Sequence, residues 1–300
     1  MPHPIRSVAA WPSAMTLLLA VVAQFGASPA AAADIVFLIG EKEYDTRETL
    51  PTWAADWLEP AGHRCTFVHA LREQPSRFPG AAAIDTADLL VVSVRRRAMT
   101  KADLDRVRAH VAAGRPVIGV RTSSHAFDPK DEVQEGDDTW RTFDVDVLGA
   151  RYVNHLRNKE GTTIDPIRDA AAHPILTGVP PQPFHSGGTL YRMFDIAPDV
   201  ERLANGLTTQ PPEGERKFDD PTDADGFVVF PVAWCRTLDT GSRVFATTLG
   251  HVDDFKQPAF QRMLANAVSW TLGEPIGPVA SNRRSEPKNA TRDGEPAAVR

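Results

Sequence analysis

The sequence predicts an α/β protein built on a doubly wound, mostly parallel sheet. Over residues 34–120, short apolar runs alternate with segments whose apolar residues recur at helical spacing. The runs are apolar throughout, which is typical of strands buried on both faces. The 300-residue chain is 42% hydrophobic and 24% charged, as expected of a globular protein. Together these observations favour one sheet with helices on both faces.

The first half of the chain contains four strand candidates and two helix candidates. The strands are expected at 34–40, 63–69, 87–94 and 115–120. The first helix follows the first strand, because Leu50, Trp53 and Leu58 share one helical face. The second helix begins after Thr100, a residue type that caps helix N-termini, and ends at Gly114.

The second half is less regular until its end. A short helix is predicted before Gly149, and a final helix with an apolar stripe is predicted to end at Gly273. The short helix is expected at 139–148, strands at 160–167, 189–194, 227–235 and 243–250, and exposed loops at 128–138 and 209–226.

The two ends of the chain differ from the part between them. Residues 1–33 resemble a secretory signal, with an early arginine, an apolar stretch and an alanine-rich run before Asp34. The apolar stretch is shorter than the roughly 20 residues that a membrane span needs. Residues 277–300 form a polar tail with little to bury. We therefore expect one domain at 34–276, in a mature chain that is periplasmic or secreted and has no membrane span.

Charge and cysteine content exclude several classes of protein. The formal net charge is -6 and the folded part has no basic tract, so nucleic acid is not an expected partner. Two cysteines, Cys65 and Cys235, are too few for a disulfide scaffold or a four-thiolate zinc site. Whether the two cysteines pair, and whether the chain forms an oligomer, stays open.

Candidate site residues follow the predicted strands. In open α/β sheets, ligands bind beyond the carboxyl ends of the strands, so the loops after each strand are expected to meet at one edge. These loops contribute the candidates Tyr44, Arg97, Arg121, Ser123, Ser124, His125, Trp234, His251, Asp253 and Asp254. His155 is a further candidate from the irregular middle of the chain.

His251 is the leading candidate for a proton-transfer group. It follows a glycine and precedes Asp253 and Asp254, and a nearby carboxylate can orient a histidine. The alternative interpretation is an exposed loop histidine. Ser123 and Ser124 have the alternative of capping a helix.

The sequence predicts neither a metal nor a cofactor. Metal-binding histidine spacings such as H-x-H and H-E-x-x-H do not occur. The glycine-rich loops that bind nucleotide phosphates do not occur either.

Several segments resemble one family. Residues 116–128, 140–155, 173–175, 230–234 and 243–275 are similar, in sequence and in their order along the chain, to the ThuA-like, trehalose-utilisation family of the class I glutamine amidotransferase-like superfamily. The likeness runs through nearly all of 34–276. It implies a flavodoxin-like, three-layer α/β/α sandwich.

The resemblance also implies a departure from glutamine chemistry. Glutamine amidotransferases carry a cysteine nucleophile in a Gly-x-Cys-x-Gly turn, and that pattern places Gly119 at the first glycine and Arg121 at the cysteine. An arginine cannot serve as that nucleophile because its guanidinium stays protonated. Many ThuA-like relatives have a histidine at this position. His251 falls where the superfamily has its late histidine.

The resemblance implies a small-molecule carbohydrate as the partner, such as a keto-glycoside or a disaccharide derivative. In this hypothesis His251, oriented by Asp253 or Asp254, moves a proton beside a carbonyl, as in an isomerase, lyase or hydrolase. Arg121, helped by Arg97 or His125, stabilises the oxyanion, and Trp234 or Tyr44 stacks on the sugar. The alternatives are a non-catalytic sugar-binding or assembly module, and a serine hydrolase that uses Ser123 or Ser124.

Overall fold

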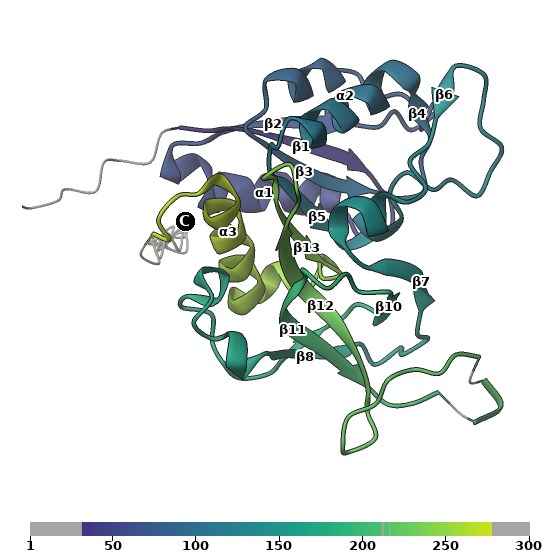
Figure 1. Cartoon of the computed structure of the whole chain (residues 1–300), viewed down its shortest axis with the longest axis vertical. Helices are drawn as coiled ribbons and strands as arrows, with labels where there is room; N and C mark the ends of the chain where they lie inside the picture. Colours follow the sequence, from purple (N-terminus) through teal and green to yellow (C-terminus); the bar gives the residue numbers. More distant parts are fainter. Residues whose placement is uncertain (1–31, 212, 216, 278–300) are drawn as a thin grey trace, which may run out of the picture. The chain divides into compact units, whose positions relative to one another are not determined.

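A nine-stranded mixed sheet organises the fold (Figure 1). The structure is a computed structural model that describes residues 32–211, 213–215 and 217–277. The predicted signal sequence and polar tail therefore lie outside the described residues, except at their inner ends. None of the helices in the described ranges is long and apolar enough to cross a membrane.

The sheet has a parallel half and an antiparallel half. Its strand order is β2-β1-β3-β5-β13-β12-β11-β8-β9. Neighbours from β2 to β13 are parallel, and neighbours from β13 to β9 are antiparallel. In this order, the strands are β2 (Arg64–His69), β1 (Asp34–Gly40), β3 (Leu89–Val94), β5 (Val117–Val120), β13 (Arg243–Thr247), β12 (Val228–Thr237), β11 (Glu201–Thr208), β8 (Thr162–Pro166) and β9 (Phe184–Ser186).

Three helices cover the parallel half. Helices α1 (Thr46–Trp57) and α3 (Pro258–Leu272) lie on one face, and α2 (Lys101–Ala112) lies on the other (Figure 1). The 3-10 segment Ala81–Thr86 packs against α2. The predicted α/β sandwich is confirmed, with a sheet that is mixed.

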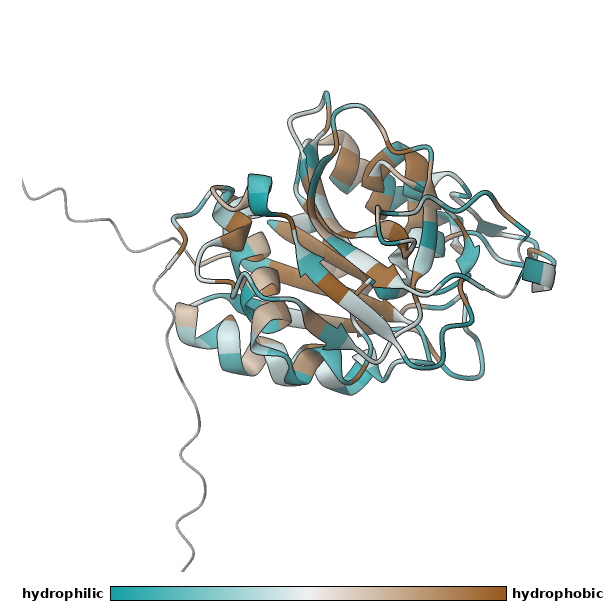
Figure 2. Ribbon diagram, turned by 90° about the horizontal axis from the view of Figure 1, so that it is seen from below, coloured by the Kyte–Doolittle hydropathy of each residue, from teal (hydrophilic) through white to brown (hydrophobic). Residues whose placement is uncertain are grey.

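The central strands are buried on both faces, as their continuous apolar runs predict. Every residue of β3 and β5 is buried, and so is every residue of β1 after Asp34. Figure 2 shows apolar residues concentrated along the central strands. Burial of these strands by helices on both sides is what the doubly wound arrangement requires.

The antiparallel half matches the predicted strands at β8, β12 and β13 and departs from them at β9 and β11. The sequence does not predict β11, in which Asn205 and Gly206 are poor strand formers. Tertiary packing requires the glycine, because a Cβ at Gly206 would lie 2.6 Å from Val232 Cγ1. The helix predicted at 139–148 is reduced to one π-helical turn, Asp144–Leu148, before Gly149 at φ 81°.

Two small antiparallel pairs complete the described strands. Strand β10 (Tyr191–Phe194) pairs with β7 (Arg151–His155), and β4 (Met99–Thr100) pairs with β6 (Asp137–Asp138). The first pair matters for the site, because it brings two tyrosines to the carboxyl edge of the parallel strands.

Candidate functional site

The carboxyl ends of four adjacent parallel strands position the candidate site. Strands β1, β3, β5 and β13 are neighbours in the sheet, so the loops that follow them meet at one edge. Contacts between these loops are direct: the Arg121 Nη1 group donates to the Thr248 carbonyl over 2.5 Å. The ring centroids of Tyr44 and His251 lie 6.0 Å apart.

Arg121 lies at the centre of this edge and is only 2% exposed. It follows β5 directly and has φ 48°, a left-handed conformation that costs a non-glycine residue roughly 1–2 kcal/mol. Its guanidinium lies between two aromatic rings, 4.5 Å from the centroid of Tyr44 and 4.4 Å from that of Tyr191. This turn is the one at which the resemblance described above places the cysteine of glutamine amidotransferases.

The polar atoms of Arg121 are turned into the protein. Nη2 donates to the Thr189 carbonyl over 3.3 Å and to the Tyr44 hydroxyl over 3.4 Å. Within the described residues no carboxylate forms an ion pair with this guanidinium. Burial lowers the pKa of Arg121, but the phenol groups of Tyr191 and Tyr44 more than offset it, so its pKa is raised overall. Arg121 therefore stays charged, both of its Nη groups donate to protein oxygens, and its Nε is buried without a hydrogen-bond partner among the described residues.

His251 lies at the exposed side of the same edge. Its side chain is 25% exposed, and its Nδ1 lies 3.5 Å from the Asp253 Oδ2 atom. The backbone N–H of Asp253 donates to Nδ1 over 3.2 Å. Lys256 donates a hydrogen bond to Asp253, which is the main reason that the pKa of this carboxyl is lowered. A charged carboxylate therefore lies beside the imidazole.

Asp254 does not orient the His251 ring, which is the role predicted for it, but binds the loop backbone. Its Oδ2 atom accepts the backbone N–H groups of Gly250 and His251, at 2.8 and 2.9 Å. The side chain is fully buried and holds the loop backbone, so Asp253 is the carboxylate that contacts the imidazole ring. The expectation for Asp254 is corrected accordingly.

His125 is more buried than His251 and contacts the rings of Tyr152 and Tyr191. Its ring stacks on Tyr152 with centroids 4.3 Å apart and lies 5.9 Å from the ring of Tyr191. Burial holds the pKa of His125 well below its usual value, and Arg96 and other nearby cations add to this effect. His125 is therefore neutral at physiological pH and joins the cluster through aromatic contacts.

The two serines do not contact His251. Ser124 Oγ pairs with His125 Nδ1 at 3.2 Å and with the Arg121 carbonyl at 3.4 Å. Ser123 Oγ lies against Gly119, where a Cβ would be 2.7 Å away. Because a serine hydrolase needs its nucleophile within hydrogen-bond reach of the base, this geometry does not support that alternative.

Trp234 is outside the site, contrary to the prediction. It lies within β12, which is antiparallel to β13, so it does not follow the carboxyl end of a parallel strand. Its side chain is fully buried, and its Nε1 donates to the Leu148 carbonyl over 2.7 Å. Trp234 is a core residue and cannot stack on a bound sugar.

His155 lies near Tyr191, whereas Arg97 contacts the end of β1. His155 is exposed at the end of β7, and its ring centroid is 6.3 Å from that of Tyr191. Arg97 is half-buried after β3, and its Nε donates to the Gly40 carbonyl over 3.0 Å.

A glycine pair that sequence reasoning did not single out completes the site. A Cβ at Gly187 would lie 2.9 Å from both His251 Nδ1 and Asp253 Oδ2, and a Cβ at Gly188 would lie 2.8 Å from Arg121 Nη1. The loop after β9 thus covers both leading candidates at close range. The two adjacent glycines were the available signal in the sequence. Tyr191 and Tyr152 had no comparable signal in the sequence, because only the pairing of β10 with β7 brings them to the site.

One group of potential metal ligands lies elsewhere in the described residues. His173 Nε2, Glu201 and Cys235 have ligand atoms within 4.8 Å of one another. However, Ile175 N–H donates to His173 Nδ1, so the neutral ring carries its proton on Nε2, which faces the Cys235 Sγ atom at 3.5 Å. Burial also raises the pKa of the Cys235 thiol to about 12. This arrangement is a histidine–thiol hydrogen bond.

The two cysteines are free thiols. Cys65 lies on β2 at the end of the sheet, and Cys235 lies on β12, with four strands between them. The question of pairing left open by the sequence is thereby answered for this structure.

Comparisons with known proteins agree with this architecture. A family model described as ThuA, trehalose utilisation, matches residues 36–271. A ThuA-like protein from Bacteroides uniformis has a similar fold, with a TM-score of 0.55 and 15% identity over 82% of this chain and 95% of its own. A ThuA-like protein from Parabacteroides merdae gives a TM-score of 0.52 and 12% identity over 83% of this chain and 93% of its own.

No curated protein sequence matches the chain. The two solved structures share the fold, and the family model covers most of the sequence. The chain therefore belongs to the ThuA, or trehalose-utilisation, family.

Proposed function

We propose that the protein acts on a small carbohydrate by proton transfer at His251. Membership of the trehalose-utilisation family indicates a carbohydrate-related role. The observation that carries the finer proposal is the His251–Asp253 pair, which lies at the exposed side of a buried Arg121–tyrosine cluster. The substrate class is a keto-glycoside or disaccharide derivative, and the signal-like residues 1–33 support export to the periplasm or medium.

His251 supplies the proton in this proposal. Because the Asp253 N–H donates to Nδ1, a neutral imidazole carries its own proton on Nε2. That proton is available to a carbonyl or glycosidic oxygen of a bound sugar. The Asp253 carboxylate, 3.5 Å from Nδ1, stabilises the ring when both nitrogens are protonated.

Arg121 acts as a positioning residue and not as the oxyanion donor predicted from the sequence. It is buried, and its Nη groups are directed to the Thr248 and Thr189 carbonyls and the Tyr44 hydroxyl. Its cation–π contact with Tyr44 holds that half-buried ring beside His251. Tyr44 therefore remains the aromatic candidate for contact with the sugar.

The test is turnover of disaccharides and their 3-keto forms by the purified protein, followed by NMR with and without a chelator. We expect His251→Ala to lower the rate by at least about 100-fold, the size of a typical general acid–base contribution. Ser124→Ala should keep its turnover, because Ser124 pairs with His125. Loss of turnover in S124A but not in H251A would contradict the proposal and favour the serine hydrolase. The chelator arm reports any metal requirement.

A non-catalytic binding or assembly module is the second candidate. It is favoured by one observation, that a buried arginine fills the strained turn after β5. Ligand-induced shifts in melting temperature without turnover of any sugar would support the module and overturn the catalytic proposal.

A further inference from the structure

A cavity of about 440 Å³ opens at the carboxyl edge of the sheet. Its lining consists of the end of β1, the loop that follows it, Arg47 at the start of α1, the loop after β2, and Arg97, which follows β3. We call it the cationic cavity, because its lining includes Lys42, Arg47, Arg72 and Arg97. Its volume lies in the range of about 300–1,000 Å³ that is typical of ligand pockets.

The cavity lies where the topology of the sheet favours a ligand. In the order β2-β1-β3-β5, the chain leaves β1 through α1 toward β2 and leaves β3 through α2 toward β5. The two connections cover opposite faces, so a crevice is expected at the carboxyl ends between β1 and β3. Gly40 and Arg97 flank this crevice, and the Gly40 carbonyl accepts a hydrogen bond from Arg97 Nε.

The four cations of the cavity make no direct ion pair, although the charges of Asp131 and Glu41 act on Arg97 from further away. Within the described residues, none of Lys42, Arg47, Arg72 and Arg97 forms an ion pair with a carboxylate. The two arginines before Arg97 differ, since Arg95 pairs with Glu43 at 2.9 Å and Arg96 with Asp128 at 2.9 Å.

The two acidic residues of the cavity offset only part of the charge of its four cations. Glu41 is buried, and its two carboxylate oxygens accept hydrogen bonds from the backbone N–H groups of Glu43, Tyr44 and Thr46 and from the Thr46 hydroxyl. Asp45 is exposed. The cavity therefore has an excess of positive charge in a chain whose net charge is -6.

The rest of the lining is apolar. Ala70, Leu71 and Pro75 form part of the wall, and Leu71 is 41% exposed. An inorganic ion would use only the charges, whereas a sugar bearing an acidic group would also cover the apolar wall.

We propose that the cationic cavity binds the carboxylate or phosphate group of a small acidic sugar, whose ring covers the apolar part of the wall. This inference rests on the proposed function, because it names the substrate class of the same edge of the sheet. Arginine binds carboxylate and phosphate through paired N–H groups, and the Nη groups of Arg97 make no hydrogen bond to other described residues.

The test is calorimetric binding of D-glucuronate, D-glucose 6-phosphate, D-glucose and inorganic phosphate to the purified protein. We expect at least one acidic sugar to bind ten times more tightly than glucose or inorganic phosphate, and its affinity to fall as salt is raised. Comparison of glucuronate with glucose 6-phosphate tells which acidic group is preferred. Equal affinity for inorganic phosphate and the acidic sugars, or no binding of either acidic sugar, would overturn the proposal.

Variants locate the site. Lys42 and Arg72 are exposed, and their side chains make no hydrogen bond or ion pair with other described residues. The double variant K42Q/R72Q should therefore fold normally. Because both residues line the cavity, it should bind the acidic sugar at least about tenfold more weakly. The matched control K159Q/R168Q removes the same two charge types from exposed positions elsewhere and should bind as the parent does. Equal weakening in both variants would mean that general charge, and not this cavity, causes the binding.

His251→Ala separates the two proposals. This variant should keep its affinity for the acidic sugar, since His251 does not line the cavity. Acidic-sugar binding that needs Lys42 and Arg72, with no turnover of any sugar, would leave this inference standing and overturn the catalytic proposal. Turnover that is equal for neutral and acidic sugars, and unchanged in K42Q/R72Q, would support the catalytic proposal and overturn the inference about the cavity.

Discussion

Arg121 shows how one residue can hold the candidate site together. It combines a strained backbone, two carbonyl acceptors and two aromatic neighbours in one buried position. The strain is local to the backbone, whereas the contacts belong to the side chain, so the two contributions can be measured separately.

Substitutions at Arg121 should separate those contributions. We expect Arg121→Ala to lower the free energy of unfolding by at least about 3 kcal/mol, because it leaves a cavity and unpaired carbonyls. Arg121→Gly loses the same contacts but relaxes the left-handed φ, so it should be about 1 kcal/mol more stable than R121A. Urea denaturation of both variants measures the difference. Equal stabilities would show that the turn is not strained.

Gly187 should control the geometry of the His251–Asp253 pair. A methyl group there would lie 2.9 Å from atoms of both side chains, so Gly187→Ala must displace one of them. We expect G187A to lower the turnover attributed to His251 by about tenfold or more, since small misplacements of reacting groups are costly. Gly214→Ala is the control, because a Cβ there meets nothing within 4 Å. Unchanged turnover in G187A would remove the glycine from the site.

At the residue scale, local sequence signals found part of the site. His251 stood out by its glycine and carboxylate neighbours, and Arg121 by its position after a strand. Trp234 was misplaced, because an apolar run does not reveal whether its strand runs parallel or antiparallel. Asp253 and Asp254 could not be told apart, since both follow His251 and only the loop conformation turns one toward the ring.

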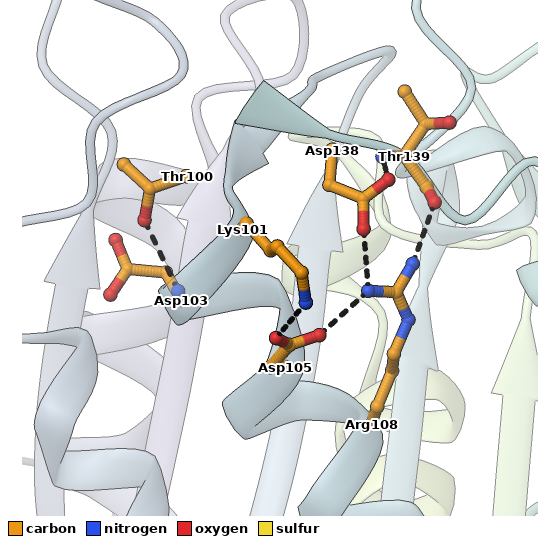
Figure 3. A network of polar contacts seen from close by, with 7 residues as sticks. All are labelled: Thr100, Lys101, Asp103, Asp105, Arg108, Asp138 and Thr139. Carbon is orange, nitrogen blue, oxygen red and sulfur yellow. Dashed lines mark hydrogen bonds and ion pairs between the residues drawn. The ribbon is translucent and has the colours of Figure 1, made fainter. Parts of the chain in front are cut away.

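Helix α2 is stabilised by a cap at its N-terminus and by ion pairs between its side chains. Thr100 Oγ1 accepts the backbone N–H of Asp103 over 3.1 Å, and Asp105 bridges Lys101 and Arg108 (Figure 3). Arg108 also binds Asp138 beyond the helix, which ties the helix to the loop that carries β6.

The cap should contribute measurably to stability. We expect Thr100→Ala to lower the free energy of unfolding by about 1 kcal/mol, because the Asp103 N–H loses its partner. Thr100→Ser keeps the hydroxyl and should stay close to the parent protein. Thermal or urea unfolding of the pair gives the comparison, and an equal loss in T100S would mean that the methyl group, not the cap, stabilises the helix.

At the element scale, the parallel half was predicted from sequence, and so were β8, β12 and β13, whereas β9 and β11 were not. Strands β1, β3 and β5 are buried on both faces, so their apolar runs carry a strong signal. Strand β11 contains Asn205 and Gly206 and owes its conformation to pairing with β12 and β8. Such cross-strand pairing has no local signal.

The whole molecule should lose stability in mild acid. Burial lowers the pKa of His63, His69, His110, His125 and His173 from their usual value of 6.5. Unfolded chains bind protons at these positions more readily than the folded protein does. The stability is therefore fully present above pH 6.5 and falls as the pH drops below that value.

His125 should account for a separable part of this acid sensitivity. Because its pKa lies well below 6.5, it contributes up to about 1.4 kcal/mol per pH unit between pH 6.5 and its folded-state pKa. In His125→Gln, the free energy of unfolding should fall less steeply between pH 7 and pH 5. Urea titrations at several pH values measure the slope, and an unchanged slope in H125Q would show that this histidine titrates normally in the folded protein.

The sequence by itself determined the fold class, the parallel strands with their helices, and the loops that carry His251 and Arg121, because apolar periodicity, caps and glycines act over a few residues. Only the tertiary structure decided that Arg121 is enclosed by Tyr44 and Tyr191, that Asp253 faces the imidazole, and that Gly187 closes over it. The cations of the cavity likewise come from helix α1 and from the loops after β1, β2 and β3. These contacts join segments that are far apart in the chain, and their geometry depends on strand direction and packing, which no local pattern records.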